Sequence, residues 1–281
     1  MRSFISLLAA ALILSHLFSV ESRGQSAMPT GGILFRTVKV HSLKGGFGTM
    51  FSIVVDGREY WITAKHIITG KPNGEVPLQR ISLDVQNPVG KEEKFESYSF
   101  QVFDTETIAD VVVLVPDASV QKISIGSVQV SSEKATIGGE CQFLGFPFAQ
   151  SWTAHMTENN TDYKMPFTKH CYIAGQVESP RVWILDGLNN EGFSGGPVLI
   201  NTGESQRILA VISGYRNAPT EVLSAEIEEN QPTKSQTPVT KTKRKVNYVN
   251  ENSGLISAFS ADYAIDAIKR HPIGPIVPIV K

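Results

Sequence analysis

Met50–Thr63 reads MFSIVVDGREYWIT, and this stretch decides the fold class of the chain. Two runs rich in β-branched and aromatic residues flank an Asp-Gly pair at positions 56 and 57. Such a pair between two β-rich runs predicts a hairpin, because both residues tolerate the positive φ angles of a tight turn. We therefore expect antiparallel strands over Met50–Val55 and Glu59–Thr63.

Short runs of the same kind recur along the chain, with Gly and Pro between them. Many short strands punctuated in this way predict an antiparallel sandwich or barrel. One later segment, 261–270, reads as a helix because Ser260 can cap it and Pro272 stops it, and the tail 272–281 should be extended. The further strands are expected at Ile33–Val40, Ile81–Val85, Ser97–Phe103, Val111–Val115, Ile123–Val130, Cys141–Leu144, Tyr172–Val177, Val182–Leu185, Val198–Ile200, Ile208–Ile212 and Leu255–Phe259.

One segment, Arg216–Val249, breaks the strand pattern. It is rich in Thr, Glu, Lys, Pro and Gln, with acidic residues first and the basic run Lys241–Lys245 later. Because it lacks sustained apolar periodicity, it predicts a long mobile loop within the domain, 216–249, rather than a linker between domains. The basic run is expected to be solvated.

The N-terminal residues 1–27 have the layout of a secretory signal peptide. A basic start at Met1-Arg2 precedes the nearly uninterrupted apolar run Phe4–Val20, and small and polar residues follow. That run is marginal for a membrane span, which needs about 20 residues, so a retained anchor is the alternative. We expect a secreted or periplasmic protein with no stable membrane span after signal removal.

Composition narrows the remaining possibilities. The chain has 281 residues, enough for one large β domain or two small ones, and a formal net charge of -1, which does not favour nucleic acid as a partner. Export implies an oxidising compartment, where the two cysteines, Cys141 and Cys171, form either one disulfide or two buried free thiols. Sequence spacing does not decide between these, and no residues stand at zinc-ligand spacing.

The sharpest chemical motif is Gly192-Phe193-Ser194-Gly195-Gly196-Pro197-Val198. A serine hydroxyl is a weak nucleophile that needs an adjacent base and donors for the developing oxyanion. Glycines on both sides of Ser194 let the backbone turn tightly, so that the amides of Gly192 and Ser194 point at one spot. The alternative is a glycine-rich turn with a structural serine.

A histidine and an acid stand beside apolar strands upstream. His66 follows an expected strand within Ile62-Thr63-Ala64-Lys65-His66, and Asp110 directly precedes the apolar run Val111–Leu114. A partly buried carboxylate needs a partner, and a histidine ring N–H is a suitable one, since it fixes the tautomer that accepts a proton from serine. Asp104 is the rival for this role, and each residue alone could be structural.

Together these motifs resemble the trypsin/chymotrypsin-like serine peptidases, with His, Asp and Ser in that family's order. The resemblance covers roughly Ile33–Arg270 and is nearest to the minimal bacterial high-temperature-requirement-type peptidase domains, although no C-terminal peptide-binding domain follows. It implies a peptidase domain over 28–271. Two packed antiparallel six-stranded β-barrels, about 33–122 and about 123–260, would be followed by the C-terminal helix 261–270.

The resemblance also implies a mechanism: a secreted serine endopeptidase that works through an acyl-enzyme, without metal or other cofactor, on protein or peptide substrates. It assigns His66, Asp110 and Ser194 to catalysis, and the amides of Gly192 and Ser194 to the oxyanion hole. Leu188 would form the floor of the substrate pocket, with Ser213 and Gly214 along the cleft. Phe193 stands where the digestive members have an aspartate, so the oxyanion loop is expected either to be held by the packing of Phe193 or to be ordered by substrate binding.

Two other functions remain open from sequence. The first is a catalytically inactive binding protein on the peptidase fold, because fold does not fix function. The second is an α/β-hydrolase-type esterase, since Gly192–Gly196 also fits that family's Gly-x-Ser-x-Gly motif. The esterase needs its acid and histidine after the serine, where the only histidine is His271.

Overall fold

A computed structural model describes residues 29–71, 74–76, 79–122, 126–202, 205–228 and 241–277, with backbone alone for 218–228 and 241–250. The expected signal peptide and the centre of the expected loop, 229–240, lie outside the described residues. Within the described ranges, no helix is long and apolar enough to cross a membrane.

The first barrel is a closed sheet of six strands. The predicted hairpin of β2 and β3 is confirmed, and its turn has positive φ angles at Asp56 (49°) and Gly57 (72°). Alternate side chains of these strands fill the barrel with an apolar core that includes Met50, Trp61 and Leu114. In order around the barrel, the strands are β1 (Thr37–Ser42), β2 (Gly46–Val55), β3 (Arg58–Thr63), β6 (Val112–Pro116), β5 (Lys94–Asp104) and β4 (Arg80–Asn87).

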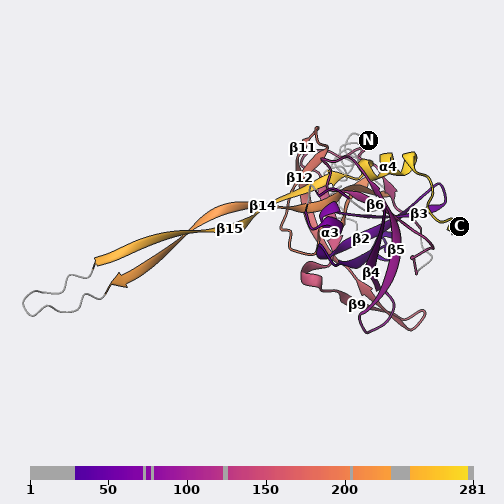
Figure 1. The fold of residues 1–281 in the computed structure, drawn as a ribbon, viewed down its shortest axis with the longest axis horizontal. Helices are drawn as coiled ribbons and strands as arrows, with labels where there is room; N and C mark the ends of the chain where they lie inside the picture. The colour runs from indigo at the N-terminus through magenta and orange to yellow at the C-terminus, as the bar shows by residue number, and fades with distance from the viewer. Residues whose placement is uncertain are drawn as a thin grey trace, which may run out of the picture.

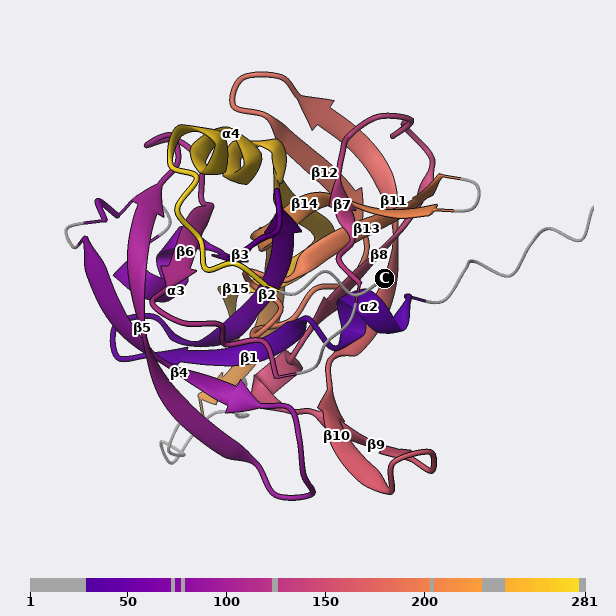
Figure 2. The same ribbon diagram turned by 90° about the vertical axis from the view of Figure 1, so that its right-hand side faces the viewer.

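The second barrel closes through the pairing of β13 with β14. A short extra strand, β7, pairs with β14 in parallel. Figure 2 shows the strands of the two barrels side by side, the first in indigo to magenta and the second in pink to yellow. The strands of this barrel are β8 (Glu140–Gly145), β11 (Phe167–Val177), β12 (Val182–Asp186), β15 (Lys241–Ser260), β14 (Ser205–Glu228) and β13 (Pro197–Thr202), with β7 at Gln129–Val130.

A shared apolar core joins the two barrels. It contains Phe51 and Val113 from the first barrel and Leu144 and Val211 from the second. Because side chains from both sheets fill one cluster, the relative position of the barrels is fixed by packing. The two-barrel fold confirms the expected fold class, and its antiparallel sheets rule out the α/β-hydrolase alternative.

The prediction of a loop over 216–249 is wrong for the parts of this segment that the structure describes. There β14 and β15 continue as paired antiparallel strands, out to Glu228 opposite Lys241. Figure 1 shows this ribbon projecting far from the barrels. Its register sets Glu226 opposite Lys243 as well. A search of the sequence for apolar periodicity alone does not find such a hairpin. The expected mobility of 216–249 stays a prediction.

Other local differences are small. The expected strand Ile33–Val40 begins with a helical turn, α2 (Gly31–Leu34). Of the expected strand Ile123–Val130, the structure describes 126–130, where β7 covers Gln129–Val130. The hairpin of β9 (Trp152–Met156) and β10 (Thr161–Met165) was not expected. Two further short helical segments, α3 (Lys65–Thr69) and η1 (Pro147–Ala149), lie next to the functional site described below.

The C-terminal helix α4 spans Asp262–Arg270, one residue shorter than predicted. Ala261 takes the N-cap position, while the Ser260 hydroxyl accepts a hydrogen bond from the Asp262 amide at 3.3 Å. Its apolar face, which includes Tyr263 and Ile268, packs into the core shared by the barrels. The described part of the tail then runs beside the β2–β3 turn, where Ile276 pairs with Arg58.

Cys141 and Cys171 form a disulfide, which decides the question that the sequence left open. They are direct partners in the register of β8 and β11, and both side chains are buried. The bond therefore joins two neighbouring strands inside the second barrel and closes a separation of 30 residues.

We expect replacement of both cysteines by serine to lower the free energy of unfolding by about 3 kcal/mol, because the open chain gains entropy when unfolded. Urea unfolding of the oxidised wild type and the double variant measures this difference. The reduced wild type should resemble the variant. Equal midpoints for the oxidised wild type and the variant would contradict this role for the bond.

Candidate active site

Ser194 lies in a tight turn between β12 and β13, and two positions of this turn require glycine. Gly192 and Gly195 have φ angles of +96° and +85°, in the left-handed region that L side chains rarely adopt. A Cβ on Gly192 would lie 2.1 Å from the Phe146 carbonyl oxygen, and one on Gly195 would lie 2.1 Å from that of Thr49. The two glycines thus let the turn approach both barrels closely.

Thr49 of β2 holds this turn from the first barrel. Its amide donates to the Ser194 carbonyl at 2.8 Å, and its hydroxyl donates to the Gly192 carbonyl at 2.6 Å. The same hydroxyl accepts a hydrogen bond from the Phe146 amide at 3.3 Å. The sequence analysis did not predict this role of Thr49.

His66 and Asp110 lie in direct contact. His66 belongs to α3, just after β3, and its Nδ1 is 2.7 Å from Asp110 Oδ2. Its backbone amide donates to Asp110 Oδ1 at 2.9 Å. The Asp110 side chain is 1% exposed and that of His66 is 20% exposed. The carboxylate is thus held from two sides, while the ring retains access to solvent.

Ser213 connects the serine and the acid. Its hydroxyl donates to Asp110 Oδ2 at 2.5 Å, and its carbonyl accepts a hydrogen bond from Ser194 Oγ at 3.1 Å. Ser213 is the extra residue of a β-bulge in β14, between Ile212 and Gly214. The sequence placed Ser213 along the substrate cleft and missed its contact with Asp110.

Asp104, the rival acid, has a different partner. Its carboxylate is 2.7 Å from the ammonium of Lys65, a side chain that is almost fully buried. Lys65 also donates to the Glu106 carbonyl at 3.2 Å. Of the two candidate acids, Asp110 is therefore the one that contacts His66.

Ser194 and His66 open into one cleft with a volume of about 600 Å³. Among the described residues there is no hydrogen bond between the Ser194 hydroxyl and His66. Likewise, none of the hydrogen bonds within the described chain uses the amide of Gly192 or Ser194. These amides are therefore available to a group bound in the cleft, whose lining comprises Gly45, Gly46, Phe47, His66, Ile67, Phe148, Ala149, Glu191, Gly192 and Ser194.

The residues expected to bind substrate contribute less to this cleft than the residues expected to catalyse the reaction. Leu188 is 57% exposed and does not line this cleft. Its carbonyl accepts a hydrogen bond at 2.8 Å from Lys169, whose pKa is lowered by burial. Gly214 pairs with Ser257 in β15, directly after the bulge at Ser213. The structure thus leaves the choice of a pocket floor open.

Phe193 is fully buried beneath the turn. Its ring makes an edge-on contact with Phe143, with centroids 4.9 Å apart, and the Lys169 ammonium lies 5.3 Å from its centroid. An aromatic anchor of this kind fixes the residue between the two free amides, because its ring has no room to move. A packed Phe193 is what the first of the two alternatives for the oxyanion loop requires, and the role of that loop stays a prediction.

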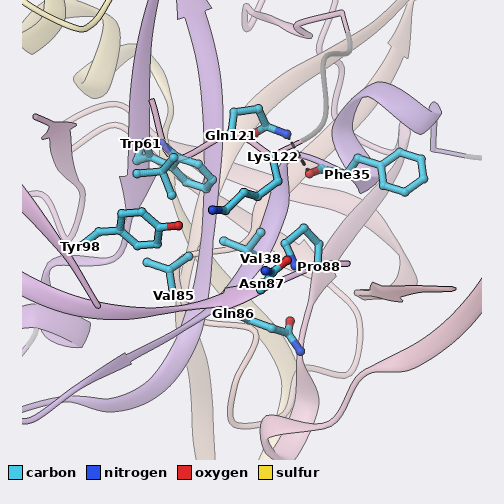
Figure 3. A pocket seen from close by; sticks show the side chains of 11 residues that line it. Phe35, Val38, Trp61, Val85, Gln86, Asn87, Pro88, Tyr98, Gln121 and Lys122 are labelled. Carbon is cyan, nitrogen blue, oxygen red and sulfur yellow. Dashed lines mark hydrogen bonds between the residues drawn. The ribbon is translucent and has the colours of Figure 1, made fainter. Parts of the chain in front are cut away.

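A second hollow, lined in part by Val38, Trp61 and Val85 of the first barrel's core, is too small to be a ligand site (Figure 3). Its volume of about 10 Å³ leaves room for a single water molecule. Lys122 at its rim donates to Glu96 at 2.9 Å. Hydrogen bonds from Tyr98 and Lys122 lower the pKa of Glu96 to about 2.

Comparison with known proteins gives matches in structure only. No protein-family model and no curated protein matches the chain. The HtrA-type protease AlgW, in a structure with a tripeptide, matches with a TM-score of 0.50 and 12% identity, over 85% of this chain. This chain spans 60% of the AlgW chain. Protease Anisep from Arthrobacter nicotinovorans matches with a TM-score of 0.50 and 14% identity, over 86% of this chain and 97% of Anisep.

At such low identities the matches establish the fold alone. The two closed six-stranded barrels and the short C-terminal helix fit the chymotrypsin-like fold. This chain therefore has the chymotrypsin-like fold found in HtrA-type and trypsin-like serine proteases.

Proposed function

We propose that this protein is a serine endopeptidase with Ser194 as nucleophile, His66 as general base and Asp110 as the acid that orients the base. The observation that carries the proposal is the 2.7 Å contact of His66 Nδ1 with Asp110, in the cleft that also contains Ser194. This contact keeps a proton on Nδ1 and leaves Nε2 to accept one.

The first step is attack on the substrate carbonyl. The Ser194 hydroxyl must leave its hydrogen bond with the Ser213 carbonyl and turn to His66 Nε2. As the serine oxygen bonds to the carbonyl carbon, the hydroxyl proton passes to Nε2, and Asp110 stabilises the resulting imidazolium. Hydrogen bonds from the His66 amide and Ser213 keep the Asp110 carboxylate fixed during this transfer.

The carbonyl oxygen becomes negatively charged in the same step. The amides of Gly192 and Ser194 would donate to it, since no other hydrogen bond within the described chain occupies them. Their positions are set beforehand by Thr49 and by the packing of Phe193. Donors that are already in place lose little free energy to rearrangement during the reaction.

The intermediate then breaks down. His66 gives its proton to the leaving amine, the C–N bond breaks and the acyl group stays on Ser194. Water next loses a proton to His66 and attacks the acyl carbonyl. When the bond between the acyl carbon and the Ser194 oxygen breaks, His66 returns that proton to the oxygen, which restores the hydroxyl and releases the acid product. This series of reaction steps needs no metal or organic cofactor.

Peptide and protein substrates fit the open cleft and the protease fold. The matched proteins are described as proteases, and the AlgW structure holds a tripeptide. The signal-like N-terminus and the disulfide support export, because such bonds persist in oxidising compartments. We therefore propose that the protein is secreted or periplasmic and acts on proteins or peptides.

We expect Ser194→Ala and His66→Ala each to abolish the digestion of casein, because members of a triad act as a unit. A fluorophosphonate probe should label wild-type Ser194 and leave Ser194→Ala unlabelled. Circular dichroism checks that both variants fold. A wild type that neither reacts with the probe nor digests casein would instead be a binding protein on this fold.

We expect Asp110→Asn to lower kcat by about 10⁴, because an amide at this position favours the wrong tautomer of His66. Asp104→Asn is the matched control, since Asp104 contacts Lys65 instead. Peptide hydrolysis measures both rates. The assignment of the acid is wrong if Asp104→Asn is the more damaging change.

We expect Ser213→Ala to lower kcat by about tenfold, because a hydrogen bond to a charged group contributes about 1.5 kcal/mol or more. The variant leaves the backbone carbonyl of Ser213 in place and removes only the donor to Asp110. Ser99→Ala, on the exposed side of β5, serves as control. Equal kcat values for Ser213→Ala and wild type would show that His66 alone holds the acid.

A further inference from the structure

Lys39 of β1 is a buried charge that the proposed mechanism does not use. Its side chain is 1% exposed, and its ammonium pairs with Glu93 and donates to the Ala149 carbonyl. The ammonium also lies 5.7 Å from the ring centroid of Phe95 and 5.9 Å from that of Phe146. A buried ammonium is costly unless it is paired, so these contacts form a dedicated site for it.

The Ala149 carbonyl belongs to a backbone segment in an unfavourable conformation. Phe148 and Ala149 have φ angles of +50° and +57°, in the left-handed region that non-glycine residues seldom occupy. Such residues persist only where their surroundings hold them. The charge of Lys39 supplies that hold from the opposite barrel, through the carbonyl of Ala149.

The same segment supports the turn that contains Gly192. The Phe148 amide donates to the Glu191 carbonyl at 2.8 Å. The Phe146 carbonyl lies so close to Gly192 that a Cβ there would be 2.1 Å from it. Phe148, Ala149, Glu191 and Gly192 also share the lining of the cleft. A shift of 146–149 would therefore displace the Gly192 amide.

We propose that Lys39 is a positioning residue for the oxyanion hole, acting through the Ala149 carbonyl and the Phe148–Glu191 hydrogen bond on the amide of Gly192. The inference rests on the proposed peptidase function. It adds a connection between the barrels that is separate from the contacts of Thr49. Lys39 does not line the cleft, so its removal should alter the geometry of catalysis and leave direct substrate contacts in place.

This role predicts a characteristic change in kinetics. An oxyanion hole stabilises the transition state more than the bound substrate, so a displaced donor lowers kcat and has little effect on KM. Loss of one donor typically lowers kcat by about 10² to 10³. Lys39 acts on the Gly192 donor indirectly, and we expect a loss of about 10- to 100-fold on the same basis.

The test is Lys39→Met, which keeps most of the apolar stem and removes the charge. We expect kcat for a peptide substrate to fall by about 10- to 100-fold, with KM within about twofold of wild type. Affinity for a peptide boronic acid, whose adduct with Ser194 places an oxygen in the oxyanion hole, should fall in parallel. Affinity for the matching product peptide should not change.

Lys122→Met is the matched control, because Lys122 also pairs with a glutamate on the first barrel but lies away from the cleft. It should retain wild-type kcat and KM. A folded Lys39→Met variant with unchanged kcat, or with a change confined to KM, would overturn the proposal.

If Lys39→Met does not fold, as judged by circular dichroism, Glu93→Gln decides the question. Glu93 is 42% exposed, so this change is tolerable for folding, and it weakens the hold on the ammonium. A kcat several-fold below wild type at constant KM would support the proposal, and an unchanged kcat would overturn it. An inactive wild type would refute the peptidase function itself, and the role of Lys39 would fall with it.

Discussion

The hydrogen bond from the Thr49 amide to the Ser194 carbonyl is the constraint on which the site depends. It joins a strand of the first barrel to the turn of the second, and the Thr49 hydroxyl reinforces it at Gly192. His66 and Asp110 come from the first barrel and Ser194 from the second. The relative positions of these three side chains therefore depend on how the two barrels are joined. The shared apolar core makes that junction rigid.

The contacts across this junction are polar and buried. Thr49, Asp110 and Lys39 are all nearly inaccessible to solvent, and each meets partners in the other barrel. A buried polar group that loses its partner destabilises the folded state, because water cannot reach it to replace the lost hydrogen bond. These residues therefore favour one arrangement of the two barrels over others with similar apolar packing.

Much of the fold could be predicted because its signals are local. The Asp56-Gly57 turn and the apolar runs around it specify a hairpin within 14 residues, and both features are present in the structure. The β9–β10 hairpin was not predicted, although Tyr163 and Met165 of β10 are buried in a small apolar cluster; its partner β9 is largely exposed. The outer part of the β14–β15 ribbon was missed because the sequence of 216–249 lacks sustained apolar periodicity, whereas its backbone pairs out to Glu228 opposite Lys241.

The contacts of the site were harder to predict than its residues. Sequence motifs singled out Ser194, His66 and Asp110, but the partner of Asp104 depends on where Lys65 lies after folding. Ser213 shows the physical limit most clearly. Strict alternation along β14 would assign it to one face of the sheet, whereas a bulge inserts it as an extra residue. That insertion lets one residue direct its hydroxyl at Asp110 and its carbonyl at Ser194, and nothing in the local sequence specifies a bulge at this position rather than one residue away.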